Sequence, residues 1–382
     1  MKKKSMGYVI LVSALAYIAL NMAHPVTPMF IRENNLPSYL FGVFFAAMSV
    51  GNLLFSPLWG KLSDKGGRIK YLIIGLIGYG LSQVGFGFST NPIIIIIFRF
   101  LGGVFVVSFL TVMLAYIADI TTEEKRLKAM AYYGASTTVG GAIGSLLGGI
   151  LGNSNYKITF IVQIIICIIV SIILYLLLAE SVDKNSIKNS ENKIKEKKKI
   201  SLSLPIIIIM VQVGVFFFAT TSYNSSINYF IESVLNLPPS VNGIFLAIAG
   251  ILAFLTNLFV TPILGKRFGE YRSLKLSFIS MALFMFIATI TKSTLLFFIF
   301  IIAFVCCAAV GLPLLQNIIS KLGKDNNGAI AGIQNSSRAV GMIIGSLYSG
   351  FIFDFGNKLP FITASIILII GFVILQVFYK EN

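Results

Sequence analysis

The stretch GKLSDKGGRIK, residues 60–70, gathers four basic side chains, one carboxylate and three glycines between two nearly uncharged runs. A carboxylate four residues before a basic side chain on a helix can pair with it. Glycine tolerates tight turns and close backbone approach. These residue types at this spacing indicate a charged contact at a turn, which could hold neighbouring elements together.

Three ionisable side chains stand inside long apolar runs. Arg338 lies roughly 15 Å into its run and Arg99 about 10 Å into another, at 1.5 Å per helical residue. A charge at a helix centre in hydrocarbon costs at least about 2.5–3.5 kcal/mol, so such residues are functional candidates. His24 is the only histidine, and its near-neutral titration makes it a candidate proton carrier.

The composition shows what must position these residues. Of 382 residues, 57% are hydrophobic and 12% charged, far from an ordinary soluble domain. Helices of about 20 apolar residues cross a bilayer. We therefore predict an all-α membrane protein with twelve transmembrane helices, near 6–30, 39–59, 69–89, 92–118, 129–152, 157–179, 203–231, 240–264, 273–291, 293–320, 328–352 and 359–379.

The basic residues predict the orientation. Of 30 lysines and arginines, 24 fall on the tails and the even-numbered loops, and four on the opposite side: Arg32, Lys157, Lys292 and Lys358. Positive charge is retained on the cytoplasmic side, so both termini should be cytoplasmic in a cell membrane. The net charge of +16 then reflects topology, and we expect no nucleic-acid partner.

Nothing in the sequence indicates an enzyme. We find no nucleophile paired with a base, no metal cluster and no phosphate-binding glycine loop. The three cysteines, Cys167, Cys306 and Cys307, lie within apolar runs and form no disulfide framework. We expect no cofactor and no metal.

The chain divides into two similar halves. A lysine-rich segment, 180–204, separates residues 1–179 from 205–382, so we predict two pseudo-symmetric six-helix bundles joined by a cytoplasmic linker. GAIGSLLGGI (141–150) matches GMIIGSLYSGF (341–351) at an offset of 201, and SPLWGK (56–61) resembles TPILGK (261–266). Repeated halves with a substrate site between them are a recurring transporter plan.

Residues 60–70 resemble the signature loop of the major facilitator superfamily, whose motif positions are filled by Gly60, Asp64, Lys65, Gly67, Arg68 and Lys70. HPVTPMF (24–30), FRFLGG (98–103) and YIADITTEEKR (116–126) extend the resemblance, which is closest to the twelve-helix bacterial multidrug and metabolite exporters, a drug:proton antiporter group. The resemblance implies a small-molecule substrate, protons as coupling ion, a lipid-embedded monomer and alternating access.

Within this family resemblance the charged loop is expected to act as a latch. Asp64 is suited to the N-terminus of the helix near Gly328, and Arg68 could pair with Asp119. A second glycine motif, Gly140, Gly144, Ser145, Gly148 and Gly149, resembles the antiport signature with serine in place of proline, and predicts tight packing against the 240–264 helix.

Polar residues are expected to line the substrate cavity: Tyr17, Asn21, Arg99, Tyr223, Asn224, Asn228, Gln316, Asn317, Gln334, Asn335 and Arg338. No carboxylate lies at comparable depth, which favours a neutral or anionic substrate over the cationic drugs that the resemblance favours. Arg99 has a structural alternative, as has Arg338. A receptor or scaffold that binds without transporting, or a passive channel, is a further alternative.

Overall fold

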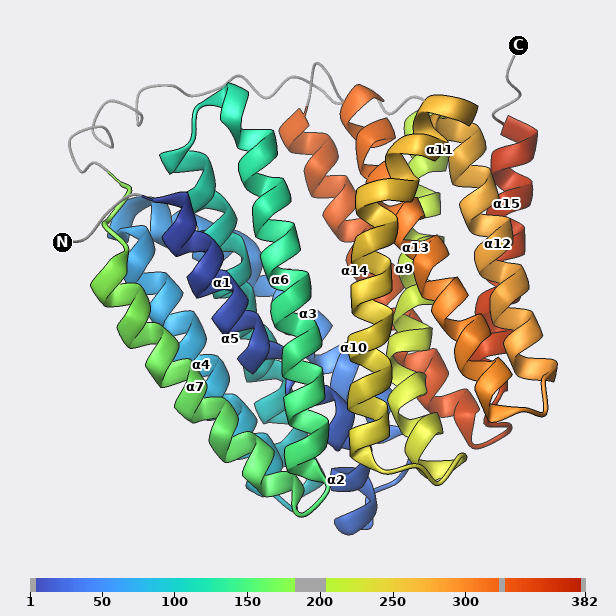
Figure 1. Cartoon of the computed structure of the whole chain (residues 1–382), viewed down its shortest axis with the longest axis horizontal. Coiled ribbons are helices and arrows are strands. Elements are labelled where there is room, and N and C mark those ends of the chain that lie inside the picture. Colours follow the sequence, from blue (N-terminus) through green and yellow to red (C-terminus); the bar gives the residue numbers. More distant parts are fainter. Residues whose placement is uncertain (1–4, 183–203, 323–326, 379–382) are drawn as a thin grey trace. The chain divides into compact units, whose positions relative to one another are not determined.

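The structure is a computed structural model that describes residues 5–182, 204–322 and 327–378, apart from the side chains of 123, 127, 327–329 and 331. The described chain is helical (Figure 1). Its elements are α1 Met6–Asn21, η1 His24–Val26, α2 Thr27–Glu33, α3 Leu40–Gly66, α4 Arg68–Phe88, α5 Pro92–Ile120, α6 Glu123–Gly152, α7 Tyr156–Leu177, α9 Leu204–Ser233, α10 Pro239–Leu255, η2 Thr256–Val260, α11 Thr261–Phe268, α12 Glu270–Ile290, α13 Thr294–Leu322, α14 Asn327–Phe353 and α15 Leu359–Phe378.

The prediction of membrane-spanning helices is confirmed. Eleven stretches of the described chain are long and apolar enough to cross a bilayer, with Met6–Glu33 and Pro239–Phe268 each counted as one. The twelfth helix, α14, has 27 residues and a more polar composition that includes Asn335 and Arg338. Exposed isoleucines follow one face of α7, as expected for a helix in lipid: Ile158, Ile161, Ile165, Ile168, Ile169 and Ile172.

Two of the predicted spans are interrupted. The 6–30 helix breaks at η1, where Pro25 removes a backbone donor. The 240–264 helix contains a π-helical turn, Thr256–Val260, just before Pro262. The linker prediction falls mostly on 183–203, outside the described residues.

Helix contacts divide the chain into two compact units. The first comprises Met1–Leu36, Ala47–Lys197 and Leu237–Ala247, and the second Pro37–Ala46, Lys198–Asn236 and Ile248–Asn382. In the first unit α1 packs on α6, α4 on α5, and α7 on α4 and α1. In the second, α9 packs on α14, α12 on α13, and α15 on α12 and α9. The same four pairings recur, so the repeat seen in the sequence is a repeat of helix packing.

Candidate functional site

The charged stretch is almost entirely helical. The α3 helix runs to Gly66 and α4 begins at Arg68, so Gly67 alone makes the turn, with φ 91° and ψ 147°. Only glycine adopts this conformation readily. Gly60 differs from the expectation, because a Cβ atom there would meet nothing closer than Thr111 at 3.9 Å.

Arg68 is the centre of the cluster at this junction. Its Nε donates to Asp119 Oδ2 at 2.9 Å, the pairing suggested by the sequence, and its Nη1 donates to Asp64 Oδ1 at 2.5 Å and Ser63 Oγ at 2.7 Å. The Arg68 side chain is 9% exposed, against 28% for Asp119 and 61% for Asp64. A largely buried guanidinium therefore joins α3, α4 and the end of α5.

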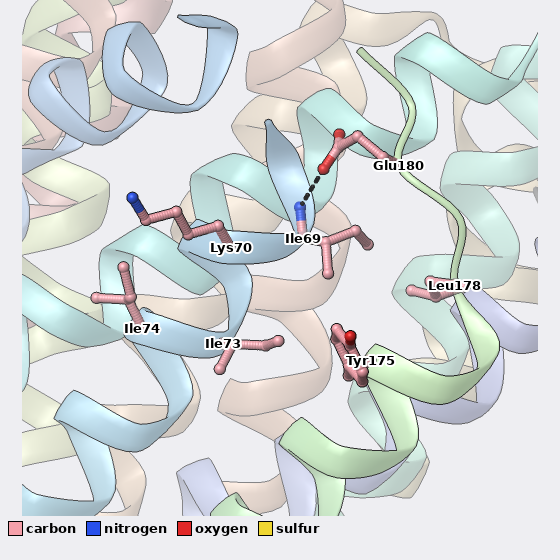
Figure 2. A pocket seen from close by; sticks show the side chains of 7 residues that line it. All are labelled: Ile69, Lys70, Ile73, Ile74, Tyr175, Leu178 and Glu180. Atoms are coloured by element: carbon pink, nitrogen blue, oxygen red, sulfur yellow. Dashed lines mark hydrogen bonds between the residues drawn. The ribbon is translucent and has the colours of Figure 1, made fainter. Parts of the chain in front are cut away.

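Glu180 completes the junction and was missed by the sequence analysis. Its carboxylate accepts the backbone N–H groups of the first two residues of α4, Arg68 at 2.8 Å and Ile69 at 3.1 Å. Figure 2 shows the bond from Ile69. A helix N-terminus has unpaired donors and partial positive charge, so a carboxylate is well suited to cap it. Ser181 adds a hydrogen bond from its Oγ to Asp119 Oδ2. Glu180 and Ser181, which follow α7, are thus hydrogen-bonded to the charged cluster.

The second unit has a matching junction of different chemistry. Gly269 separates α11 from α12 with φ 79° and ψ 163°, as Gly67 does in the first unit. Glu270 accepts hydrogen bonds from Lys321 Nζ at 2.7 Å and Asn317 Nδ2 at 2.6 Å. Asn317, expected in the cavity, is therefore placed at this junction near the end of α13.

The glycines of α6 pack against a different helix from the one expected. A Cβ atom built on Gly140, Gly144 or Gly148 would lie 2.1–2.2 Å from a carbonyl oxygen of α1 or of its C-cap residue. These oxygens belong to Ala14, Ile18 and Met22. Spacing by four residues places all three glycines on one helix face, and that face meets α1 rather than α10.

The next residues of α6 meet α10, as the sequence predicted. A Cβ atom on Gly149 would lie 2.4 Å from the carbonyl oxygen of Pro239, and one on Gly243 would lie 2.5 Å from that of Ser145. Ser145 itself is buried. Close packing here involves backbone from both helices.

The second unit repeats both contacts with other residues. Gly341 and Gly345 of α14 face the carbonyl oxygens of Gly214 and Phe218 in α9, at 2.4 and 2.5 Å from a built Cβ. Gly350 faces the carbonyl of Tyr39 at 2.6 Å. Each glycine lies 201 residues after its counterpart.

Arg99 is surrounded by polar and aromatic side chains of the first unit. Its side chain is buried, donates to Thr27 Oγ1 at 3.0 Å and Gln83 Oε1 at 3.4 Å, and lies 3.5 Å from the ring centroid of Phe86. Thr27 in turn donates to the carbonyl of Ala23 at 2.8 Å. Arg99 thus supports the backbone where the first membrane span breaks, which favours its structural alternative.

The same break holds His24, which begins η1 and is half-buried. Backbone carbonyls just before it accept side-chain donors: Gln163 Nε2 donates to Ala19 at 2.6 Å, and Tyr79 donates to Leu20 at 3.1 Å. These contacts satisfy acceptors that the interruption of the helix would leave exposed to hydrocarbon.

Tyr17 and Asn21, the cavity candidates on α1, face α6. The hydroxyls of Tyr17 and Tyr133 are 3.5 Å apart with their rings edge to face, and Asn21 bonds its own helix at the carbonyl of Tyr17. Asn21 also lies beside Gly141. Tyr133 is a further polar residue of this group that the sequence analysis did not select.

The cavity candidates of the second unit lie on α9, α13 and α14. Tyr223 and Asn228 are buried, whereas Asn224 and Gln316 are exposed. Tyr223 packs edge to face on Phe304 at 5.1 Å, and Asn228 donates to the carbonyl of Asn224 at 3.4 Å.

Arg338 is the exposed cation of α14, and its guanidinium lies 4.8 Å from the ring centroid of Phe217 in α9. Cation–π contacts of this kind orient a guanidinium without neutralising it. Asn335 is exposed and Gln334 half-buried in the preceding turn. The first half of α14 thus presents a positive charge and two amides.

Glu232 of α9 is a buried carboxylate, 3% exposed, one residue before the end of its helix. Among the described residues, no group of three histidine, cysteine, aspartate or glutamate side chains could hold a metal ion.

Comparisons with known proteins agree with this architecture. The profile of the Major Facilitator Superfamily matches residues 9–346 and 209–382. Multidrug resistance protein 2 of Bacillus subtilis is 28% identical, over 98% of this chain and 95% of its own length. Multidrug resistance protein 1 of the same organism is 24% identical, over 97% and 96%. A crystallised D-xylose–proton symporter shares the fold with a TM-score of 0.79 at 15% identity, covering 98% of both chains.

Proposed function

The chain belongs to the major facilitator superfamily, and from this premise we propose that it exports small amphipathic compounds across the cytoplasmic membrane in exchange for protons. It is a multi-pass membrane transporter and not an enzyme. The observation that carries the proposal is the full-length similarity to two multidrug resistance proteins of Bacillus subtilis. The charge asymmetry of the loops supports a cytoplasmic position for both termini in this proposal.

We propose that residues 1–179 and 205–382 form the two halves that alternate, with 180–204 as linker. The latch comprises Gly60, Asp64, Lys65, Gly67, Arg68 and Asp119. The ion pairs of Arg68 at 2.9 and 2.5 Å support a role as a switchable contact, since charged hydrogen bonds at a partly wet surface can break and re-form. The partner of Asp64 near Gly328 stays a prediction.

A second candidate is the export of one neutral or anionic metabolite. Arg338 favours it, because an exposed cation next to an aromatic ring within a membrane-spanning bundle would attract a negative group. In this proposal Arg338, Gln334 and Asn335 contact the substrate, and His24 is the proton carrier.

Transport in proteoliposomes with an imposed proton gradient tests both candidates. A lipophilic cation and an organic anion of similar size are compared in wild type, Arg338→Ala and the control Arg267→Ala, whose side chain is exposed near the end of α11. If the cation collapses the proton gradient in both wild type and Arg338→Ala, the result supports multidrug export. Anion transport lost only in Arg338→Ala supports the metabolite exporter.

Substrate binding without flux in every gradient would contradict both candidates and favour a receptor. Flux that neither saturates nor responds to the gradient would favour a channel. The proton role of His24 has its own test, since His24→Gln should uncouple flux from the gradient between pH 6 and 8. Normal coupling in that variant would exclude His24 as the carrier.

A further inference from the structure

A groove of about 510 Å³ lies between α4 and the end of α7, on the side of the Gly67 turn. Its walls are aliphatic, from Ile69, Ile73 and Ile74 of α4 and from Leu178 just after α7. Tyr175 also lines the groove, and its side chain is 54% exposed. Figure 2 shows Ile73 and Ile74 on one side of the groove and Tyr175 on the other.

The groove exists because α4 and α7 approach closely only further along their length. A Cβ atom on Gly80 would lie 3.1 Å from Ile164, and one on Gly87 would lie 2.2 Å from the ring of Phe160. Towards the Gly67 turn, isoleucines replace glycines at this interface. The α7 helix ends at Leu177, and the chain then crosses to bring Glu180 to the start of α4.

Two charged groups stand at one end of the groove. Glu180 accepts N–H donors from Arg68, Ile69, Ser181 and Val182, at 2.8–3.2 Å, so its carboxylate is already satisfied. Lys70 is exposed and makes no ion pair within the described part of the chain; its Nζ lies 5.6 Å from the ring centroid of Tyr71. The charged group available to a ligand is therefore the ammonium of Lys70, next to an aliphatic wall.

We propose that this groove binds one anionic phospholipid, with an acyl chain along Ile73 and Ile74 and the phosphate at Lys70. The groove lies between the ends of two helices that are long and apolar enough to span a membrane, so it would open at the boundary between the lipid headgroups and the hydrocarbon. Basic pockets between such helices on the cytoplasmic side suit anionic headgroups. The choice of the cytoplasmic leaflet rests on the orientation given under the proposed function, whereas binding itself does not depend on transport.

Thermal unfolding of the purified full-length protein in detergent tests the site. The probes are dioleoylphosphatidylglycerol, dioleoylphosphatidylethanolamine and dioleoylphosphatidylcholine at equal concentrations. Wild type should gain more thermal stability from phosphatidylglycerol than from the two zwitterionic lipids. Lys70→Gln should bind phosphatidylglycerol about fivefold more weakly, the factor that corresponds to about 1 kcal/mol per lysine near an anionic surface.

Matched controls separate this groove from general charge attraction. Lys61→Gln removes an exposed lysine of the same charged stretch outside the groove and should keep the wild-type response. Ile73→Trp should fill the groove and reduce the response to phosphatidylglycerol, whereas Ile165→Trp, on the exposed face of α7, should not.

Three results would overturn the proposal. An equal response to all three lipids would show that the groove does not select an anionic headgroup. An equal loss in Lys61→Gln and Lys70→Gln would assign the effect to net charge. A changed oligomeric state in Ile73→Trp, with the lipid response intact, would assign the groove to a second copy of the chain.

Discussion

The backbone of Gly144 rests against the carbonyl oxygen of Ile18, so closely that a Cβ atom on the glycine would lie 2.2 Å from that oxygen. A carbon atom and an oxygen atom that are not bonded to each other do not approach to that distance, and this oxygen belongs to the rigid backbone of a helix. Any larger residue at 144 must therefore push α1 and α6 apart.

Gly144→Ala should destabilise the protein by about 1–3 kcal/mol, the usual cost of overpacking. Gly134→Ala is the matched control on the same helix, because nothing lies within 4 Å of a Cβ at that site. There alanine should be neutral, or stabilising by about 0.5–1 kcal/mol through helix propensity. Thermal unfolding of both variants measures the difference, and equal midpoints would contradict the packing argument.

Gly67→Ala should also destabilise the protein, by about 1–3 kcal/mol, because residue 67 has φ 91° and a Cβ would meet the Glu180 carboxylate at 2.7 Å. Gly60→Ala should be tolerated, since its site has room for a methyl group. The yield of folded protein and its unfolding midpoint distinguish the two. Loss of folded protein in Gly60→Ala, with normal folding of Gly67→Ala, would contradict the conclusion that Gly67 and not Gly60 requires glycine.

Asp119→Asn and Asp64→Asn should differ in stability but agree in transport. Loss of the Asp119 charge leaves the largely buried guanidinium of Arg68 with one carboxylate and should cost about 1–3 kcal/mol. Asp64 is 61% exposed, and its pair with Arg68 should contribute less than about 0.5 kcal/mol. If the cluster gates transport, both variants should slow it, on the order of tenfold.

The informative comparison is unfolding midpoint against initial transport rate for these two variants, with Lys128→Gln as an exposed control. Wild-type rates in Asp64→Asn would remove the latch from the mechanism and leave the cluster a structural one.

Arg99→Lys should reduce folded yield even though it keeps the positive charge. A lysine lacks the planar fork that reaches both Thr27 and Gln83, and it stacks less well on Phe86. Thr27→Val should have a milder effect, of about 1 kcal/mol, because it removes one acceptor. A folded Arg99→Lys protein with selectively impaired substrate binding would instead place Arg99 in the cavity.

The membrane spans were predictable because a run of apolar residues is enough to define each one. The breaks were not, since proline alone does not locate them: Pro57 and Pro313 lie inside the unbroken helices α3 and α13. At η1 the broken backbone is supported by Gln163, Tyr79 and the Arg99–Thr27 pair. Those partners come from distant parts of the sequence.

In the candidate site, too, the local contacts were predictable from the sequence and the long-range contacts were not. Asp64 and Arg68 are close in sequence, and Asp119 followed from the family resemblance. Glu180 is 112 residues from Arg68, and no local pattern indicates that it caps α4. Likewise, spacing by four residues identified the glycine face of α6, but not that α1 would be its partner.

The π-helical turn of the second unit lies where the two halves differ in length. TPILGK begins 205 residues after SPLWGK, whereas Gly269 lies 202 residues after Gly67, so the second copy is shorter between this motif and the glycine turn. A π turn, bonded from i to i+5, holds one residue more than an α turn. Thr256–Val260 stands directly before TPILGK, on the side where the second copy has gained residues. The wide turn therefore takes up part of that added length within the helix, and Gly269 keeps the backbone conformation of Gly67.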